Sequence, residues 1–328
     1  MIVSAIVDPE VFGAASIQNS TTRDKAVALL KGLATNGVWI DKAKSNSLLD
    51  QAIKAASGLD TKLGQRVLLA LQELKKDWKR QVAAFGRLEG RIEDGGFAGQ
   101  AKDLYDKSKP DGIFVSDANR EAVEAEAVPT EKLVRVDELH DSGVEKLRIS
   151  LIEPEKPLNE LAEAEIENLV GRALKFSSYI HLFDYLMAGK RGSAQSNFMP
   201  GIQNLINIWD KAYVFGEAVP RVLFLYPAAE RPLSSGTQPC EEVDQILDDC
   251  IVTQLQCGSI KIERHPKQDP NSFCHARGFI AKRRAYTIDP GIDALKVFPP
   301  TRPMLFARSK AAEVYFSQYQ ALEGLAKK

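Results

Sequence analysis

Residues that build metal centres and redox sites are scarce, since the 328-residue sequence contains only four cysteines and four histidines. All four cysteines lie in the C-terminal third and form no Cys-x-x-Cys pair, and no histidine stands at zinc-finger spacing from them. We therefore expect no structural zinc. The thiols are expected to be reduced, as in a cytoplasmic protein.

Long apolar runs and excess charge are missing too. The start, MIVSAIVDPEVF, has no basic residue and its apolar run stops at Asp8, so we expect neither a signal peptide nor a membrane span. A net charge of -1 gives no overall attraction for nucleic acid, so phosphate binding would require a local basic cluster. No P-loop, GxGxxG, HExxH or nucleophile elbow occurs, and we expect no cofactor.

The ordinary apolar and charged fractions, 44% and 27%, predict a folded globular protein, and the length is sufficient for two domains. Segment 153–158 contains two prolines beside acidic residues and is predicted to be a linker. We therefore predict two α/β domains, at residues 1–150 and 159–328.

Strand and helix patterns alternate in the first domain, as is typical of an α/β sheet. MIVSAIV is a β-branched strand, and residues 22–35 form a helix with a threonine N-cap and an Asn-Gly stop. Helical periodicity continues over 46–58 and 61–85, and strands are predicted in VWI, DGIFVSD and KLVRVDEL. The glycine-rich segment 86–99 is predicted to be a mobile loop.

Asp8 and Asp117 each follow a predicted strand of this domain. Functional groups usually lie at the carboxyl ends of parallel strands, so the two carboxylates are candidate metal ligands. In layout, though not in any motif, the arrangement is similar to small metal-dependent nucleases of the PIN type. The alternative is that both residues cap helices or occupy turns, where aspartate is common.

The second domain begins with a helix at 161–176, the apolar strand SYIHLFD, a helix at 200–211 and the strand RVLFLYP. An amphipathic helix in CEEVDQILDDCIVTQLQ then precedes three strand-like runs, and a short strand and a closing helix end the pattern. His181 lies in an apolar strand and is expected to be a core residue rather than a catalytic base.

In the strand-like run SFCHARGFI, alternation places His275 and Arg277 on one face, where both side chains can contact one ligand. An imidazole can attack phosphorus while a guanidinium neutralises the phosphate oxygens. The following run KRRAYTI adds Lys282 and Arg284 as phosphate-binding candidates. If the two runs form a hairpin, we expect Arg284 to lie near Arg277. The alternative for the basic run is a solvated strand edge.

Three short stretches, IHLFDYLMAG at 180–189, HAR at 275–277 and IDPGID at 288–293, resemble the phospholipase D-like fold. Within it they are similar to the divergent branch that includes the C-terminal domain of microtubule-interacting-and-transport proteins and many bacterial proteins. The resemblance implies that Asp184, His275, Arg277 and Asp293 line one end of a sheet, with His275 and Asp184 as catalytic candidates. It covers less than half of the chain.

The sequence also departs from active phospholipase D proteins. Their motif reads His-x-Lys with an aspartate five residues further on, whereas Arg277 replaces the lysine here and Lys282 replaces the aspartate. Active members use two such motifs, and this chain has one. Catalysis would therefore require a homodimer or an acid of another type.

Two functions remain open on the sequence alone. One is a nucleic-acid or phosphodiester-directed protein with metal-independent nuclease activity, in a bacterial defence or mobile-element system where PIN-like and phospholipase D-like modules are usually found. The other is a catalytically silent scaffold that binds a partner protein or an acidic lipid through the same basic cleft. In both cases we expect a homo-oligomer, with partner subunits left open.

Overall fold

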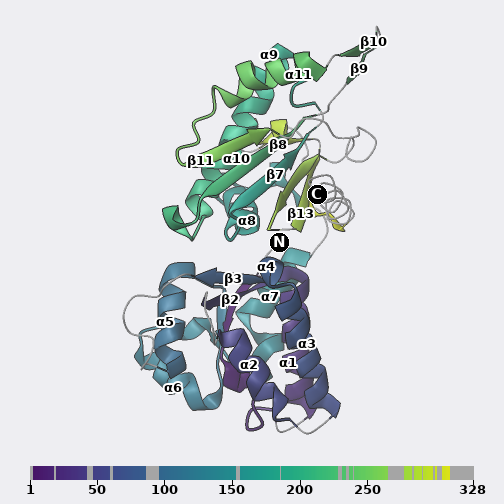
Figure 1. Cartoon of the computed structure of the whole chain (residues 1–328). Coiled ribbons are helices and arrows are strands. Elements are labelled where there is room, and N and C mark those ends of the chain that lie inside the picture. Colours follow the sequence, from purple (N-terminus) through teal and green to yellow (C-terminus); the bar gives the residue numbers. More distant parts are fainter. Residues whose placement is uncertain are drawn as a thin grey trace. The chain divides into compact units, whose positions relative to one another are not determined.

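The computed structural model describes residues 3–17, 20–42, 47–59, 62–85, 96–152, 156–184, 186–227, 231–233, 236–238, 240–264, 277–282, 284–289, 291–297, 300 and 305–310. The chain forms two compact units, Met1–Glu153 and Pro154–Lys328, called here the N-terminal and the C-terminal unit. Both combine helices with a β-sheet (Figure 1), as the α/β prediction requires. Within the described residues, every helix is too short or too polar to cross a membrane.

The N-terminal unit is built on a parallel five-stranded sheet with the strand order β3-β2-β1-β4-β5. Its strands are β1 (Val3–Val7), β2 (Gly37–Lys42), β3 (Val82–Phe85), β4 (Gly112–Phe114) and β5 (Leu133–Val134). From β1 the chain proceeds outward to β3, and it then returns to place β4 on the other side of β1. The topological switch point, where α/β sheets usually bind ligands, therefore lies between β1 and β4.

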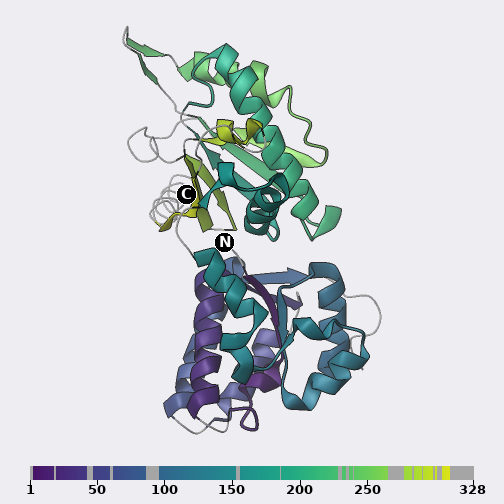
Figure 2. The same cartoon turned by 180° about the vertical axis from the view of Figure 1, so that it is seen from behind.

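Helices cover both faces of this sheet, because each connection between parallel strands crosses over it. In Figures 1 and 2, α5 and α6 lie on one side and α1, α2 and α3 on the other. The helices are α1 (Ser20–Asn36), α2 (Leu48–Ser57), α3 (Lys62–Lys76), α4 (Trp78–Gln81), α5 (Gly96–Ser108), α6 (Asp117–Ala125) and α7 (Gly143–Ile152).

Three sequence predictions for this unit are wrong in part. The strand predicted in KLVRVDEL is only two residues long, because the second half of that run belongs to the 3-10 helix Val136–Asp141. The helix predicted to extend to Phe85 ends at Lys76, and Val82–Phe85 instead forms the edge strand β3. A four-residue apolar run fits a strand as well as a buried helical turn, so periodicity could not separate them. The last four residues of the predicted mobile loop, 96–99, belong to α5, which begins at Gly96; residues 86–95 lie outside the described part of the chain.

The C-terminal unit contains a seven-stranded mixed sheet with the order β11-β8-β7-β12-β13-β14-β6. Strands β7, β8 and β11 are parallel, and every other neighbouring pair is antiparallel. The strands are β6 (Lys156–Pro157), β7 (Tyr179–Phe183), β8 (Arg221–Tyr226), β11 (Ile260–Arg264), β12 (Gly278–Ala281), β13 (Arg284–Asp289) and β14 (Leu305–Arg308). Two further strands, β9 (Arg231–Leu233) and β10 (Gly236–Gln238), form a separate ribbon.

The helices in the described part of this unit are α8 (Glu163–Leu174), α9 (Arg191–Ser193), α10 (Met199–Ala212) and α11 (Cys240–Leu247). The predicted closing helix falls mainly on residues 311–328, which lie outside the described residues. Helices α8 and α10 pack on one face of the sheet, behind it in Figure 1 and in front of it in Figure 2. On β7, the fully buried Ile180 and Leu182 alternate with Tyr179, His181 and Phe183 on the opposite face.

The segment predicted to be a linker, 153–158, is only in part a connection. Lys156–Pro157 forms β6, which pairs with β14 at the edge of the C-terminal sheet. Proline is tolerated there because an edge strand does not need every backbone N–H for pairing. The C-terminal unit therefore begins before residue 159.

Candidate functional site

Three strand ends of the C-terminal unit meet at one edge of its sheet. Asp184 follows the end of β7, and Arg277 immediately precedes β12, whose first residue pairs with the last residue of β7. The backbone oxygen of Arg277 accepts a hydrogen bond of 2.9 Å from the N–H of Ile288 near the end of β13. This pairing brings together Asp184, Arg277 and the turn that follows β13.

Gly291 lies at the centre of this arrangement. A Cβ atom added to it would lie 2.7 Å from Oδ2 of Asp184, 3.0 Å from Oδ1 of Asp293 and 3.4 Å from Cδ of Arg277. Its φ of +151° is also one that only glycine adopts easily. The structure therefore brings together three of the four residues that the resemblance placed at one end of a sheet. We call Asp184, Arg277, Gly291 and Asp293 the Asp184 site.

The carboxylate of Asp184 is buried and held in a fixed orientation. It accepts hydrogen bonds from the backbone N–H groups of Leu186, at 3.0 Å, and Ile292, at 3.2 Å. Burial raises the pKa of Asp184 to about 6, while the two N–H donors and Arg277 lower it and Asp293 raises it. Burial has the largest effect because it removes water from the charged form. The carboxyl group can therefore exchange a proton close to neutral pH.

Lys282 and Arg284 do not join this site, so the expectation that Arg284 lies near Arg277 is wrong. Strands β12 and β13 do form a hairpin, but Arg284 pairs with Ala281 beside the turn. Arg277 precedes the first residue of β12, at the opposite end of the strand. At a strand rise of about 3.3 Å per residue, roughly 13 Å separates the two ends. In an antiparallel hairpin, only residues equally distant from the turn become neighbours.

Both of these cations are buried, which also contradicts the solvated-edge alternative for the basic run. Lys282 is 9% exposed and Arg284 is 1% exposed. Lys282 occupies the turn with a φ of +46°, and its backbone N–H donates to Oγ of Ser177 at 2.8 Å. Burial, followed by the charge of Arg284, lowers the pKa of Lys282 to about 7. Neither residue forms an exposed phosphate track.

The histidine predictions have different outcomes. His275, the predicted nucleophile, lies outside the described residues. The prediction that His181 is a core residue is confirmed, because it is 6% exposed and its Nδ1 is 2.7 Å from the hydroxyl of Tyr226. Its ring also stacks on Phe224, with centroids 4.6 Å apart.

In the N-terminal unit, Asp8 lies at the end of β1, beside the topological switch point. Its side chain is completely buried, and both oxygens accept hydrogen bonds. Oδ2 accepts from the N–H of Ser116 at 3.0 Å, from its hydroxyl at 2.6 Å and from Nδ2 of Asn119 at 2.9 Å. Oδ1 accepts from the N–H of Glu10 at 3.0 Å. Asp8 thus ties β1 to the start of α6, as in the helix-cap alternative.

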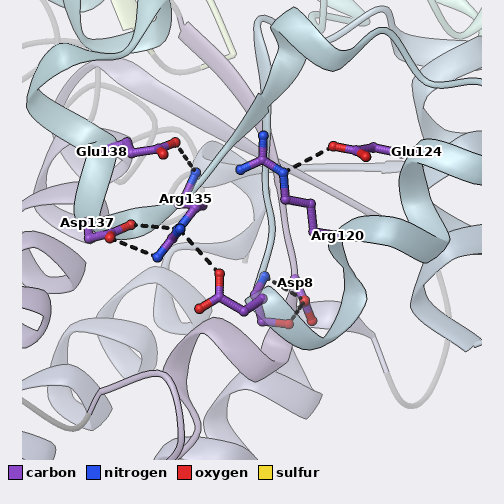
Figure 3. Close-up of polar contacts among 8 residues, drawn as sticks. Asp8, Arg120, Glu124, Arg135, Asp137 and Glu138 are labelled. Carbon is purple, nitrogen blue, oxygen red and sulfur yellow. Dashed lines mark hydrogen bonds and ion pairs between the residues drawn. The ribbon is translucent and has the colours of Figure 1, made fainter.

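Asp117 is placed differently, although it is only one residue from Ser116. Its side chain is 77% exposed, and Oδ1 lies 3.3 Å from Nε of Arg135, which follows β5. Arg135 also donates two hydrogen bonds to Asp137, from Nε at 3.1 Å and from Nη2 at 3.0 Å (Figure 3). Asp117, Arg135 and Asp137, called here the Arg135 triad, line a cavity of about 190 Å³ together with Ser16, Thr22 and apolar residues.

The PIN-like layout would imply a divalent metal at Asp8 and Asp117, but the residues do not fit one. Four donors already engage the oxygens of Asp8, and a guanidinium engages Asp117. In the described part of the chain, no group of three or more His, Cys, Asp and Glu side chains is arranged to hold a metal ion. Hard divalent cations need several oxygen ligands, and here the cation beside Asp117 is already a guanidinium.

Sequence reasoning missed Arg135 and Asp41. Arg135 follows β5, and Asp41 is the second-to-last residue of β2, so the signal was a strand-end position like the one that identified Asp8. The carboxylate of Asp41 is fully buried and accepts from the N–H groups of Lys42, Leu48 and Leu49, at 2.7, 2.8 and 3.0 Å. Burial raises its pKa to about 6, against the lowering effect of these bonds. Asp41 holds the start of α2 against the sheet.

A second cavity, of about 410 Å³, lies between α8, α10 and the residues before β11 in the C-terminal unit. Its lining includes the ion pair between Lys211 and Glu167, whose charged atoms are 2.6 Å apart. None of the predicted site residues contributes to that lining. Volume alone therefore does not identify the functional site, and the Asp184 site rests on its convergent charged groups.

Comparison with known proteins adds no family to this description. A scan against protein-family models finds no match, and a search of curated proteins finds no similar sequence.

Proposed function

We propose that the chain is a phosphodiester-directed protein whose C-terminal unit binds a nucleic-acid phosphate at the Asp184 site. The observation that carries this proposal is the convergence of Asp184, Arg277 and Asp293 around Gly291, at the end of a sheet where β7 and β8 run in parallel. Arginine is the side chain best suited to a phosphate, because its planar guanidinium can donate two parallel hydrogen bonds to the oxygens.

In this proposal Arg277 supplies the charge and Asp184 positions it. Arg277 is partly exposed, whereas Asp184 is 1% exposed and anchored by two backbone N–H groups. A fixed carboxylate beside a guanidinium limits its rotation and so lowers the entropy lost when a ligand binds. Asp184 thereby orders the arginine before the phosphate arrives.

Metal-independent cleavage is the catalytic part of the proposal. His275, two residues before Arg277 in the sequence, is the proposed nucleophile that attacks phosphorus. This attack forms an N–P bond and breaks the P–O bond to the leaving oxygen, and water then hydrolyses the phosphohistidine. The sequence contains one such motif, so another group has to protonate the leaving oxygen. Asp184, with a pKa of about 6, has the proton affinity that an acid or base near neutral pH requires.

The test measures binding and cleavage of a labelled single-stranded oligonucleotide by the full chain, with and without EDTA. We expect Arg277→Ala to weaken binding by tenfold or more, and the affinity of the wild type to fall moderately as the salt concentration rises. Arg264→Ala is the control, since this exposed arginine of the same unit pairs with Asp248 at 2.8 Å. An affinity that does not change with salt would refute phosphate binding.

The catalytic step has a separate readout. Cleavage that persists in EDTA and disappears in His275→Ala supports catalysis by the C-terminal unit. Cleavage that EDTA abolishes, and that Asp8→Ala also abolishes, would assign the activity to the N-terminal unit and refute the metal-independent mechanism.

A catalytically silent interaction module is the second candidate, and the charge distribution favours it. Two carboxylates lie close to Arg277, and Lys282 and Arg284, the two further cations that the sequence predicts in the cleft, are at the other end of β12. The Asp184 site therefore has little excess positive charge for a polyanion. Binding without cleavage, weakened by Arg277→Ala, would support this function. The expected homodimer also remains a proposal, and sedimentation analysis of the full chain tests it.

A further inference from the structure

An arginine side chain, Arg135, lies between two aspartates at the strand-end edge of the N-terminal sheet. Asp117 follows β4, and Arg135 and Asp137 follow β5, so the parallel pairing of these strands places the three residues at one edge of the sheet. Arg135 engages Asp137 with two hydrogen bonds and Asp117 with a third contact, at 3.1, 3.0 and 3.3 Å. Figure 3 shows the guanidinium pointing toward Asp137.

The local backbone fixes this geometry. The backbone N–H of Val115 on the β4 side donates to the oxygen of Val134 on β5 at 3.0 Å, which sets the distance between the two strand ends. The two-bond contact with Asp137 is the parallel arrangement in which arginine and a carboxylate interact most strongly. Arg135 is therefore part of the strand-end structure and less free than an ordinary surface arginine.

The charges around the triad define what else can bind there. One guanidinium and two carboxylates leave the triad itself with a net charge of -1. Lys25 donates to the backbone oxygen of Asp137, and Glu138 accepts from the backbone N–H of Arg135 at 3.5 Å, so one further charge of each sign lies beside the triad. Asp8 is fully buried, with four donors on its oxygens. A divalent cation at Asp117 and Asp137 would have to displace Arg135 or lie beside its positive charge. Repulsion between the two cations disfavours such a metal ion.

We infer that Arg135 takes the place of a divalent metal ion in the N-terminal unit: it neutralises Asp117 and Asp137, and a metal site appears there only when its charge is removed. This inference does not depend on the function proposed for the C-terminal unit. It predicts that the wild-type N-terminal unit has no Mn²⁺ or Mg²⁺ site at the Arg135 triad.

The test is titration of the full chain with Mn²⁺, with free Mn²⁺ measured by electron paramagnetic resonance. We expect Arg135→Gln to bind about one more ion per chain than the wild type, with the oxygen ligands and waters typical of hard cations. Arg135→Lys retains the positive charge and should bind no additional ion. Combining Arg135→Gln with Asp117→Asn should abolish the additional site.

Arg120→Gln is the matched control, because Arg120 forms a separate ion pair with Glu124 at 3.1 Å and has a similar exposed fraction to Arg135 (Figure 3). It should leave Mn²⁺ binding unchanged. Two results would overturn the inference: an Arg135→Gln variant that gains no site, or wild-type binding that Asp117→Asn abolishes. The second measurement does not require Arg135→Gln to fold.

Discussion

Lys282 allows the most direct test of the buried charge in the C-terminal unit. Unfolded lysine holds its proton up to a pH of about 10.4, whereas Lys282 in the folded chain has a pKa of about 7. Between these values the unfolded state binds more protons, so the stability of the fold rises with pH. Relative to a neutral side chain at this position, Lys282 therefore lowers the free energy of unfolding by about 4 kcal/mol at pH 7, and by only about 2 kcal/mol at pH 9.

Lys282→Met removes the charge at similar length and leaves the positive φ of the turn unchanged. We expect the variant to be more stable than the wild type at pH 7, and the difference to shrink by about 2 kcal/mol at pH 9. Lys282→Gly should be more stable than Lys282→Met by about 1 kcal/mol at every pH, because glycine also relieves the strain of the left-handed backbone conformation.

Urea denaturation followed by Trp209 fluorescence measures this effect, in a background where Trp39 and Trp78 are replaced by phenylalanine. Trp209 is a local reporter, since its indole N–H donates to the oxygen of Ser177 at 2.9 Å, and the hydroxyl of Ser177 accepts from Lys282. If the difference between Lys282→Met and the wild type were the same at pH 7 and pH 9, Lys282 would titrate normally and the reasoning would be refuted.

Three further predictions concern the two strand-end clusters, and urea denaturation measures each of them. Ser116→Ala should cost about 2 kcal/mol, because it removes the 2.6 Å hydroxyl donor from a buried carboxylate; an unchanged midpoint would contradict the structural role of Asp8. Gly291→Ala should cost about 2 kcal/mol, since the new Cβ would lie 2.7 Å from Asp184 and φ is +151°; a neutral effect would show that the turn relaxes freely. Asp184→Asn should stabilise the fold by about 2 kcal/mol more at pH 7 than at pH 4, because a raised carboxyl pKa lowers wild-type stability as the pH increases through 4 to 6; parallel pH profiles would contradict the raised pKa.

Much of the fold was predictable because its elements are strongly patterned. The helices at 20–36 and 199–212 and the strands at 3–7, 179–183 and 221–226 lie close to their predicted positions. Each has clear periodicity or a β-branched run between turn residues, so local sequence and tertiary environment favour the same structure. Strand β3 was not predictable, because its four apolar residues form a strand only through pairing with β2, which is distant in the sequence.

The candidate site was predictable to the extent that strand ends determine it. Asp184 was identified through the resemblance and Arg277 through alternation in a strand-like run, and antiparallel pairing of β7 with β12 brings the two residues together. To predict the neighbours of Arg284, one must know which residues form the hairpin turn. Moving the turn by one residue changes every pair of facing residues on the two strands. The ion pair of Arg135 with Asp117 could not be predicted without knowing that β4 and β5 are neighbours in the sheet, and only the tertiary fold shows this.

The positions of the positive charges distinguish most sharply between the two functions considered for the C-terminal unit. A phosphate track needs cations that remain in water until a ligand arrives, because desolvated cations lose their long-range attraction for a polyanion. Lys282 and Arg284 are buried at the hairpin turn. Of the three cations that the sequence predicts to bind phosphate, Arg277 therefore remains as the candidate. One arginine flanked by two carboxylates can recognise a single phosphate with defined geometry, but it cannot hold a long nucleic acid through charge alone. Phosphate binding at the Asp184 site should therefore be specific in geometry and moderate in salt dependence, with a log–log slope for Arg277→Ala shallower than the wild type by about one ion.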